Sequence, residues 1–192
     1  MSHLPLRRTV VSLSLALAGG AACAADFVVD ALLNSSSGGT GASTVSLTAG
    51  DSFSVLVNPN DLWSAGALPR WSNANGLTGP LFATGTDDSG AAAGTQIGAD
   101  FGMLSLGNLS APHGTLVGQI DSGDFFAIGT SFNGVASATG TLKLFYWDSN
   151  FGDNTEFITA SVTVGAIPEP ETYALMLAGL GLVGWMARRR RG

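Results

Sequence analysis

Short segments in which apolar and polar residues alternate fill the middle of this 192-residue chain, between one apolar stretch near each end. Because successive side chains of a β-strand point to opposite faces of a sheet, this two-residue period predicts strands with one face in a core. Gly, Asn, Asp or Pro bounds each segment, as expected where the chain turns. The predicted strands are Phe27–Leu33, Thr44–Thr48, Ser52–Val57, Thr115–Ile120, Phe125–Gly129, Gly140–Asp148 and Glu156–Val164.

Two stretches between these segments lack the alternation. Asn34–Ala42 is rich in Ser and Gly and predicts a loop. Asn58–Gly98 is dominated by turn residues, and a loop of that length inside a compact domain usually has a function or contains short strands. The Ala49-Gly50-Asp51 turn predicts a hairpin that joins the strands on its two sides. No helical period lies between the two ends of the chain, so we expect an all-β fold, an antiparallel β-sandwich of about eight strands.

The N-terminal apolar stretch has the organisation of a secretory signal peptide. Arg7 and Arg8 precede it, and a run of small residues follows it. These three regions, within residues 1–25, predict a signal helix that is removed on export. We expect the mature chain to begin near Ala25 or Asp26.

The only cysteine of the chain lies at this predicted cleavage site. Cys23 stands in a small-x-small pattern, Ala22-Cys23-Ala24, so cleavage near Ala25 discards it with the signal. Alternatively, Cys23 is the acylated first residue of a lipoprotein, although Gly20 stands where such signals favour a larger aliphatic residue. Without Cys23 the exported domain has no disulfide and no thiolate chemistry, and depends on its core and on any bound metal.

The last 26 residues, 167–192, contain three parts in order. The two prolines cannot both lie inside one helix, so the first part predicts an extended and accessible spacer. The apolar run would span about 22 Å as a helix, which is short against a hydrocarbon core of about 30 Å. The arginines predict that the distal end stays on the cytoplasmic side of a membrane. The three parts are Pro168-Glu169-Pro170, a transmembrane segment at Tyr173–Ala187, and the cluster Arg188, Arg189, Arg190 and Arg191.

This tail resembles the PEP-CTERM sorting signal of Gram-negative bacteria that make exopolysaccharide. The resemblance implies that an exosortase, a membrane transpeptidase-like enzyme, recognises and cleaves the tail. Many members of the family have Ser or Thr after the second proline, where this chain has Glu171 and then Thr172. Alternatively, the tail is an ordinary membrane anchor that is never cut. Both alternatives place the body, residues 26–166, outside the inner membrane, and the first implies transient anchoring followed by display at the cell surface or in the extracellular matrix.

Removal of both ends leaves an acidic body. Between residues 26 and 166, Arg70 and Lys143 are the only Lys or Arg residues against twelve acidic residues, which gives a formal charge of −10. We expect no nucleic-acid partner, because phosphate binding requires a cationic surface. An acidic surface attracts divalent cations instead.

One loop between two predicted strands combines residue types that bind a hard cation. Asp148, Asn150, Asp153 and Asn154 lie there within seven positions. Calcium takes six to eight oxygen ligands, and carboxylates, amide oxygens and free carbonyls in a tight loop supply several of them. The spacing is not that of an EF-hand, since Thr159 stands where the bidentate glutamate would be. Alternatively, these residues only form a turn, which is the commoner role of Asp, Asn and Gly in a hairpin loop.

Four segments of the body carry a second family resemblance. They are Pro112–Ile120, Phe125–Gly129, Gly140–Leu144 and Asp148–Asn154. Together they resemble the core pattern of galactophilic-lectin-like domains of the LecA type. That family implies a small β-sandwich of the galactose-binding-like class. It also implies a calcium ion in the loop between the last two strands, with sugar hydroxyls that coordinate the ion directly.

By position, this resemblance makes Asp148, Asp153 and Asn154 the side-chain ligands of calcium, with a backbone carbonyl near Asn150. The loop is shorter here than in the best-known lectin of the family. Trp63 stands where the family has a tryptophan followed by another carbonyl ligand. Sugar-contacting residues of the long middle loop have no counterpart that the sequence places. The resemblance therefore implies calcium as a cofactor and exopolysaccharide as a partner.

Trp147 has two alternative roles beside this loop. In the predicted strand its side chain shares a face with Phe145, opposite the core face that contains Leu144 and Tyr146. In the first alternative Trp147 stacks on the C–H face of a sugar ring and contributes to ligand binding. In the second, Phe145 and Trp147 pack beneath the long loop.

Little in the sequence indicates catalysis. His3 leaves with the signal, and His113 follows a proline in a turn. Paired carboxylates such as Asp87 and Asp88 lie in Gly/Ser-rich turns, where Asp caps backbone amides. We therefore expect a non-enzymatic protein of the exopolysaccharide or biofilm matrix that binds calcium and carbohydrate. The alternative is a purely structural or glycosylated matrix protein with no ligand site.

Overall fold

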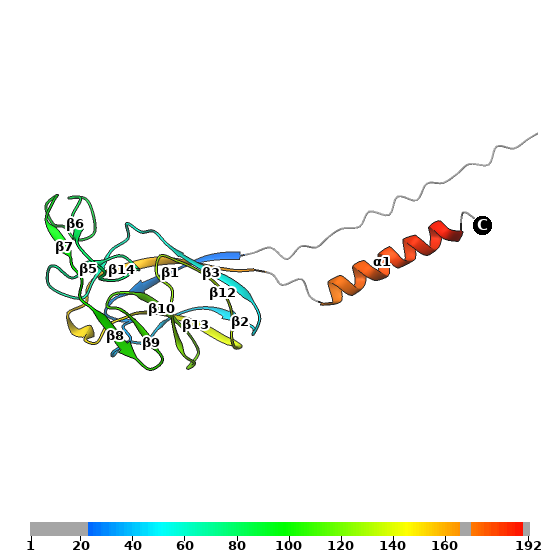
Figure 1. Ribbon diagram of the computed structural model, residues 1–192, viewed down its shortest axis with the longest axis horizontal. Coiled ribbons are helices and arrows are strands. Elements are labelled where there is room, and N and C mark those ends of the chain that lie inside the picture. Colours follow the sequence, from blue (N-terminus) through cyan, green and yellow to red (C-terminus); the bar gives the residue numbers. More distant parts are fainter. Residues whose placement is uncertain (1–22, 166–169, 190–192) are drawn as a thin grey trace, which may run out of the picture. The chain divides into compact units, whose positions relative to one another are not determined.

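Two four-stranded antiparallel sheets enclose one core, which confirms the predicted all-β sandwich (Figure 1). The structure is a computed structural model that describes residues 23–165 and 170–189. The first sheet has the order β1-β14-β3-β12 and consists of β1 (Cys23–Asp30), β3 (Ser52–Val57), β12 (Ser131–Val135) and β14 (Phe157–Val164). The second has the order β11-β10-β13-β2 and consists of β2 (Ala42–Leu47), β10 (Leu116–Ile120), β11 (Phe125–Ala127) and β13 (Gly140–Tyr146).

Three two-stranded hairpins lie in the loops of the described domain. They are β4 (Trp63–Ser64) with β5 (Trp71–Ser72), β6 (Leu81–Phe82) with β7 (Gln96–Gly98), and β8 (Met103–Leu106) with β9 (Leu109–Pro112). The long loop 58–98 thus contains short strands, as its length predicts. The alternating pattern misses β12 because Asn133 and Gly134 interrupt it, and misses β9 because that strand ends in a proline.

The turn at Ala49–Asp51 does not form the predicted hairpin. β2 pairs with β13 in the second sheet, whereas β3 pairs with β12 and β14 in the first. The chain therefore crosses from one sheet to the other at this turn. Leu47 before the turn and Phe53 after it both enter the core between the sheets. A local turn signal predicts a reversal of the chain but not the partner of the next strand, so the hairpin prediction was wrong.

The first strand also differs from its predicted bounds, Phe27–Leu33. β1 begins at Cys23, and its chain turns after Asp30, whose carboxylate Oδ1 accepts hydrogen bonds from Leu32 N at 2.9 Å and Leu33 N at 2.8 Å. This aspartate caps the turn and ends the strand early. The predicted cleavage near Ala25 falls inside β1, and the remainder of the predicted signal, residues 1–22, lies outside the described residues.

β13 is buried on both faces. Leu142, Leu144 and Tyr146 point into the core between the sheets, as the alternation predicts, and all three are fully buried. On the opposite face Phe145 and Trp147 form a second cluster, which packs against Leu104, Leu109 and Phe125 beneath the β8–β9 hairpin. The indole Nε1 of Trp147 donates a hydrogen bond to Leu104 O at 3.0 Å. Trp147 is 0% exposed. Of its two alternative roles, the structure shows packing, and the side chain presents no ring face to a sugar.

The pairing of β1 with β14 fixes where the chain enters and leaves the domain. Cys23 lies opposite Val164 at one end of this pair, and Asp30 lies opposite Phe157 at the other. The loop 148–156 that precedes β14 is therefore at the end of the sandwich away from the chain ends of the domain. Figure 1 shows the short hairpins at this same loop end.

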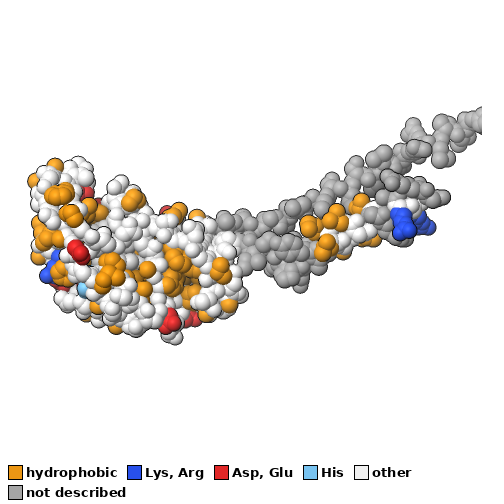
Figure 2. All heavy atoms as spheres, viewed as in Figure 1, with side chains coloured by type: hydrophobic (Ala, Val, Ile, Leu, Met, Phe, Trp, Pro, Cys, Tyr) orange, Lys and Arg blue, Asp and Glu red, His pale blue; other side chains and the backbone are white. Residues whose placement is uncertain are grey.

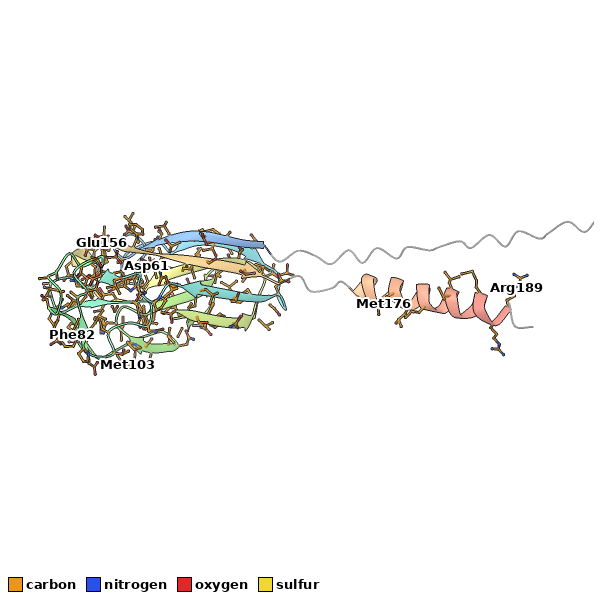
Figure 3. All side chains as sticks on the ribbon, turned by 90° about the horizontal axis from the view of Figure 1, so that it is seen from above. Asp61, Phe82, Met103, Glu156, Met176 and Arg189 are labelled. Carbon is orange, nitrogen blue, oxygen red and sulfur yellow. The ribbon has the colours of Figure 1, made fainter. Side chains whose placement is uncertain are left out.

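One face of the domain presents few charged side chains. Figure 2 shows mainly uncharged side chains and backbone on the face it draws, with few acidic or basic groups. Hydrophobic side chains are exposed at the loop end, where Phe82 is 55% and Met103 59% exposed. Both of these side chains point outward in Figure 3.

A single helix, α1 (Pro170–Arg189), follows in the described part of the tail. It begins at the second proline of the Pro168-Glu169-Pro170 motif, because the fixed φ of proline suits the first position of a helix. Among the described residues, no helix combines the length and the apolar character that crossing a membrane requires, and the transmembrane segment 173–187 stays a prediction. Pro168, Glu169, Arg190 and Arg191 lie outside the described residues.

We expect leucine-to-alanine substitutions to change the free energy of unfolding by different amounts in the core and on the surface of the sandwich. Leu144→Ala should lower the free energy of unfolding by about 2–5 kcal/mol, because it leaves a cavity at a fully buried core position. Leu56→Ala, on a side chain that is 54% exposed, should change it by about 0.5 kcal/mol or less. Urea denaturation followed by tryptophan fluorescence measures both. Equal losses for the two variants would contradict the core described here.

Candidate functional site

Three buried oxygen atoms lack a hydrogen-bond partner among the described residues. They are Ser72 Oγ, Tyr146 Oη and Asn154 Oδ1, in side chains that are 3%, 0% and 3% exposed. Leaving a buried polar atom unpaired costs about 1–3 kcal/mol, and native proteins contain few of them. A few such atoms are usual in a native domain of this size, and two of these three, Ser72 Oγ and Tyr146 Oη, lie near one glycine.

Gly114 brings two of these atoms to the same point. A Cβ atom added to this glycine would lie 2.7 Å from Ser72 Oγ and 3.3 Å from Tyr146 Oη. Ser72 comes from the end of β5 and Tyr146 from the end of β13, so the fold joins two segments that are distant in sequence. Gly114 has φ of +79°, which glycine adopts without strain, and a side chain there would collide with Ser72 Oγ.

Asp148 places a desolvated carboxylate beside these hydroxyls. It is 5% exposed, its Oδ1 accepts a hydrogen bond from Ser149 N at 2.8 Å, and its backbone N–H donates to Ser36 Oγ at 3.1 Å. Burial raises the pKa of Asp148, an effect that hydrogen bonds from Ser149 and Asn154 partly oppose. The pKa of Tyr146 is raised well above its usual value by burial and then by the charges of Asp148 and Asp153. Both carboxylates are therefore within electrostatic reach of the tyrosine hydroxyl.

A short 3-10 helix (Phe151–Asp153) supplies the second carboxylate of the site. Asn150 caps this helix, and its Nδ2 donates a hydrogen bond to Asp153 Oδ1 at 3.0 Å. Asn154 follows the helix, and its Nδ2 donates to Ala31 O at 3.0 Å, which directs the amide into the buried interior. The other carboxylate oxygen, Asp153 Oδ2, lies 3.4 Å from Arg70 Nη1.

Of the four predicted metal ligands, Asn154 hydrogen-bonds to Asp148, and Asp153 is near enough to Tyr146 to raise its pKa together with Asp148. The side chain of Asn150 is exposed and serves the helix cap and Asp153. The described residues contain no group of three or more His, Cys, Asp or Glu side chains that could hold a metal ion. A cation at this position would depend on two carboxylates together with amide and carbonyl oxygens. The metal assignment stays a prediction.

Sequence reasoning missed the residues at the mouth of this site. The guanidinium of Arg70 lies over the ring of Phe101, 4.7 Å from its centroid, and this ring meets His113 edge to face at 5.2 Å between centroids. Figure 2 shows basic, histidine and hydrophobic side chains close together at the loop end of the domain. Phe101 and His113 carry no motif, and only the three-dimensional fold places them beside Asp153 and Asp148.

The hydrogen bond of His113 runs away from the carboxylate and the serine of the site. Within residues 23–165, no hydrogen bond or ion pair joins His113 to Asp148 or to Ser72. The imidazole Nδ1 of His113 lies instead 3.3 Å from Gly102 O. A nucleophile and its base normally lie within hydrogen-bond reach of each other.

The burial of Asp148 predicts a pH-dependent stability in the absence of metal. Because burial raises the pKa of this carboxyl above its ordinary 3.8, the folded state holds the proton more tightly than the unfolded state. The stability that protonated Asp148 contributes is therefore lost as the pH rises from 3.8 through the raised pKa of the folded state. In chelator, Asp148→Asn should lose less stability than the wild type between about pH 4 and 7, measured by urea midpoints at each pH. Parallel curves for the two proteins would contradict this, and Asp124→Asn in an exposed turn is the control.

Residues 166–191 match the PEP-CTERM protein-sorting motif, which confirms the prediction made from the three-part tail. The motif covers the tail only. No curated protein sequence matches the chain. A similar solved structure is the EclA N-terminal domain, a PllA-like lectin, with a TM-score of 0.41 and 22% sequence identity over 74% of this chain and 93% of that chain. The tail of this protein thus carries the PEP-CTERM protein-sorting motif.

Proposed function

We propose that the β-sandwich is a calcium-dependent carbohydrate-binding module that is exported and sorted to the exopolysaccharide matrix. The observation that carries this proposal is the group of buried, unpaired oxygens beside two carboxylates at the loop end of the domain. A protein without a ligand there would bear the cost of those oxygens with no compensation.

The residues present fit a calcium ion. Asp148 and Asp153 supply two anionic ligands, and the unpaired Asn154 Oδ1 supplies a neutral one. Calcium is a hard cation that takes such oxygens with flexible geometry, and bound calcium would balance the carboxylate that burial leaves desolvated in Asp148. We expect a carbonyl near Asn150 to complete the set. When bound, the ion supplies a positive centre to which sugar hydroxyls coordinate.

A bound ion and the exposed ring of Phe101 suit a ligand rich in hydroxyls. Tyr146 Oη and Ser72 Oγ each have a donor and acceptor capacity that no described residue uses, but both are closed to solvent, so the sugar hydroxyls would coordinate the ion and not these two groups. Phe101, which is 45% exposed at the mouth, offers an apolar surface for the C–H face of a pyranose. Trp147 has no part in this proposal, because it is fully buried beneath β8–β9.

The tail determines where the module acts. The PEP-CTERM match supports export and processing by an exosortase-type enzyme, and we propose that the C-terminal segment retains the protein at the inner membrane until it is cut. The arginines at its end favour the cytoplasmic side. Release would then deliver the module to the cell surface or the surrounding matrix.

One observation favours a different candidate, a structural matrix protein without a ligand. Arg70 already pairs with Asp153 and so provides a positive charge where the proposal places calcium. However, this pair is long, at 3.4 Å, and both side chains are more than one-third exposed, so it contributes little. Among the described residues, Arg70 forms no hydrogen bond or ion pair with Asp148 or with the three buried oxygens. Binding of calcium separates the two candidates.

Calcium should stabilise the folded protein and a chelator should reverse the effect. An ion that binds only the folded state adds about 2.7 kcal/mol at a hundredfold excess over its Kd, and so raises the melting temperature. Asp148→Ala should abolish this response, because a charged ligand is lost, while Asp124→Asn should retain it. Differential scanning calorimetry with calcium and with EDTA provides the measurement. Identical melting curves in both buffers would leave the structural candidate.

Processing of the tail should depend on the extended spacer. Replacing Pro168, Glu169 and Pro170 by alanine should leave the protein full-length in the inner membrane, because the enzyme loses the peptide it recognises. Mass spectrometry of the protein from its native cell determines the C-terminus. An end at or near the motif supports sorting, whereas an intact Gly192 on the surface-exposed protein would show a permanent anchor.

A further inference from the structure

We propose that the ligand of this site is an acidic sugar, and that Arg70 is the residue that selects for it. This inference rests on the proposed function, since it assigns a class of ligand to the same site. The inference rests on two observations: how the guanidinium of Arg70 is held at the mouth of the site, and which charges surround it.

Arg70 is held mainly by an aromatic surface. Its guanidinium lies 4.7 Å from the centroid of Phe101, and the edge-to-face contact with His113 fixes that ring. The Nη1 atom lies 3.4 Å from both Ala65 O and Asp153 Oδ2, which are long contacts. A cation on an aromatic face stays in position when a weak ion pair breaks. Arg70 is thus oriented without depending on Asp153.

Most of the hydrogen-bonding capacity of Arg70 is unused. A guanidinium has five N–H donors in a planar fork, and the contacts within residues 23–165 engage only Nη1. The side chain is 38% exposed, so solvent and ligands reach the other donors. The second basic residue of the body, Lys143, lies in the middle of β13, opposite Gln119 of β10, and cannot replace it.

Calcium reverses the sign of the charge at the site. The carboxylates of Asp148 and Asp153 and the guanidinium of Arg70, which contacts Asp153, sum to a formal charge of −1. A bound divalent ion changes this to +1 and engages Asp153, the anionic partner of Arg70. Nearby Asp100 is committed to the turn before Gly102, whose N–H donates to its Oδ1 at 2.9 Å. The loaded site therefore has a positively charged fork with no anion on it.

A carboxylate of the ligand is the group that complements this fork. Arg binds planar carboxylates through two parallel hydrogen bonds, whereas a neutral hydroxymethyl group accepts one weaker bond. The hydroxyls of the same sugar ring would coordinate the bound ion, and its C–H face would lie on Phe101, which is 45% exposed. The combination of hydroxyls and one carboxylate describes a uronic acid within a glycan.

Isothermal titration calorimetry of the full chain compares galacturonate with galactose in saturating calcium. The wild type should bind galacturonate about tenfold more tightly, the effect of one added charge-assisted pair. Arg70→Gln should remove this preference and leave the affinity for galactose within about twofold, because it deletes only the fork. Lys143→Gln removes the same charge from another part of the domain and should keep the preference. Acetate alone should bind far more weakly than galacturonate, since it lacks the hydroxyls.

The outcomes separate this inference from the proposed function. Equal affinities in the wild type, or a preference that survives in Arg70→Gln, would overturn the role of Arg70 while calcium and galactose binding still stand. Failure to bind calcium or either sugar would overturn both. A further readout does not involve sugar: Arg70→Gln should bind calcium more tightly than the wild type, because the guanidinium no longer competes for Asp153. A weaker calcium affinity in this variant would contradict the placement of Arg70.

Discussion

The burial of β13 on both faces is the constraint on which the rest of the domain depends. One face fills the core between the sheets, and the other packs under the β8–β9 hairpin through Phe145 and Trp147. A shift of one residue would exchange these two sets of side chains between two packed layers that neither set fits, so the register of the strand is fixed. The end of β13 therefore delivers Tyr146 and Asp148 to a defined place, and the ring of Trp63 locks Tyr146 from the side at 4.5 Å between centroids.

The residues of the candidate site lower the stability of the domain when no ligand is bound. Burial keeps hydroxyl and amide oxygens unpaired and desolvates Asp148, and each of these costs free energy in the domain without ligand. Elsewhere the described residues satisfy their buried polar side chains. Local inconsistencies of this kind are expected where a protein keeps a function. The same buried oxygens and carboxylate thus destabilise the domain without ligand and form the proposed ligand site.

Sequence patterns predicted the strands that alternate strongly and missed those that do not. Seven of the eight main strands appear in the expected places, because each has one face in a core. The hairpin at Ala49–Asp51 failed, because a turn signal contains no information about the partner strand. For the site, the density of Asp and Asn in one loop predicted Asp148, Asn150, Asp153 and Asn154 as metal ligands, and their role stays a prediction. Ser72, Arg70 and Phe101 come from distant segments with no motif, and only the folded topology places them there.

The pairing of β14 with its neighbours also determines how the domain would bear a mechanical load. The tail leaves after Val164, at one end of β14, and the site lies just before Phe157, at the other. A pull between a bound matrix and a tethered tail would therefore run along β14, which is flanked by β1 and β3. Hydrogen bonds between antiparallel strands lie perpendicular to that direction, so the load would act on them in shear and not open them one at a time. A strand in this position resists extension as a unit.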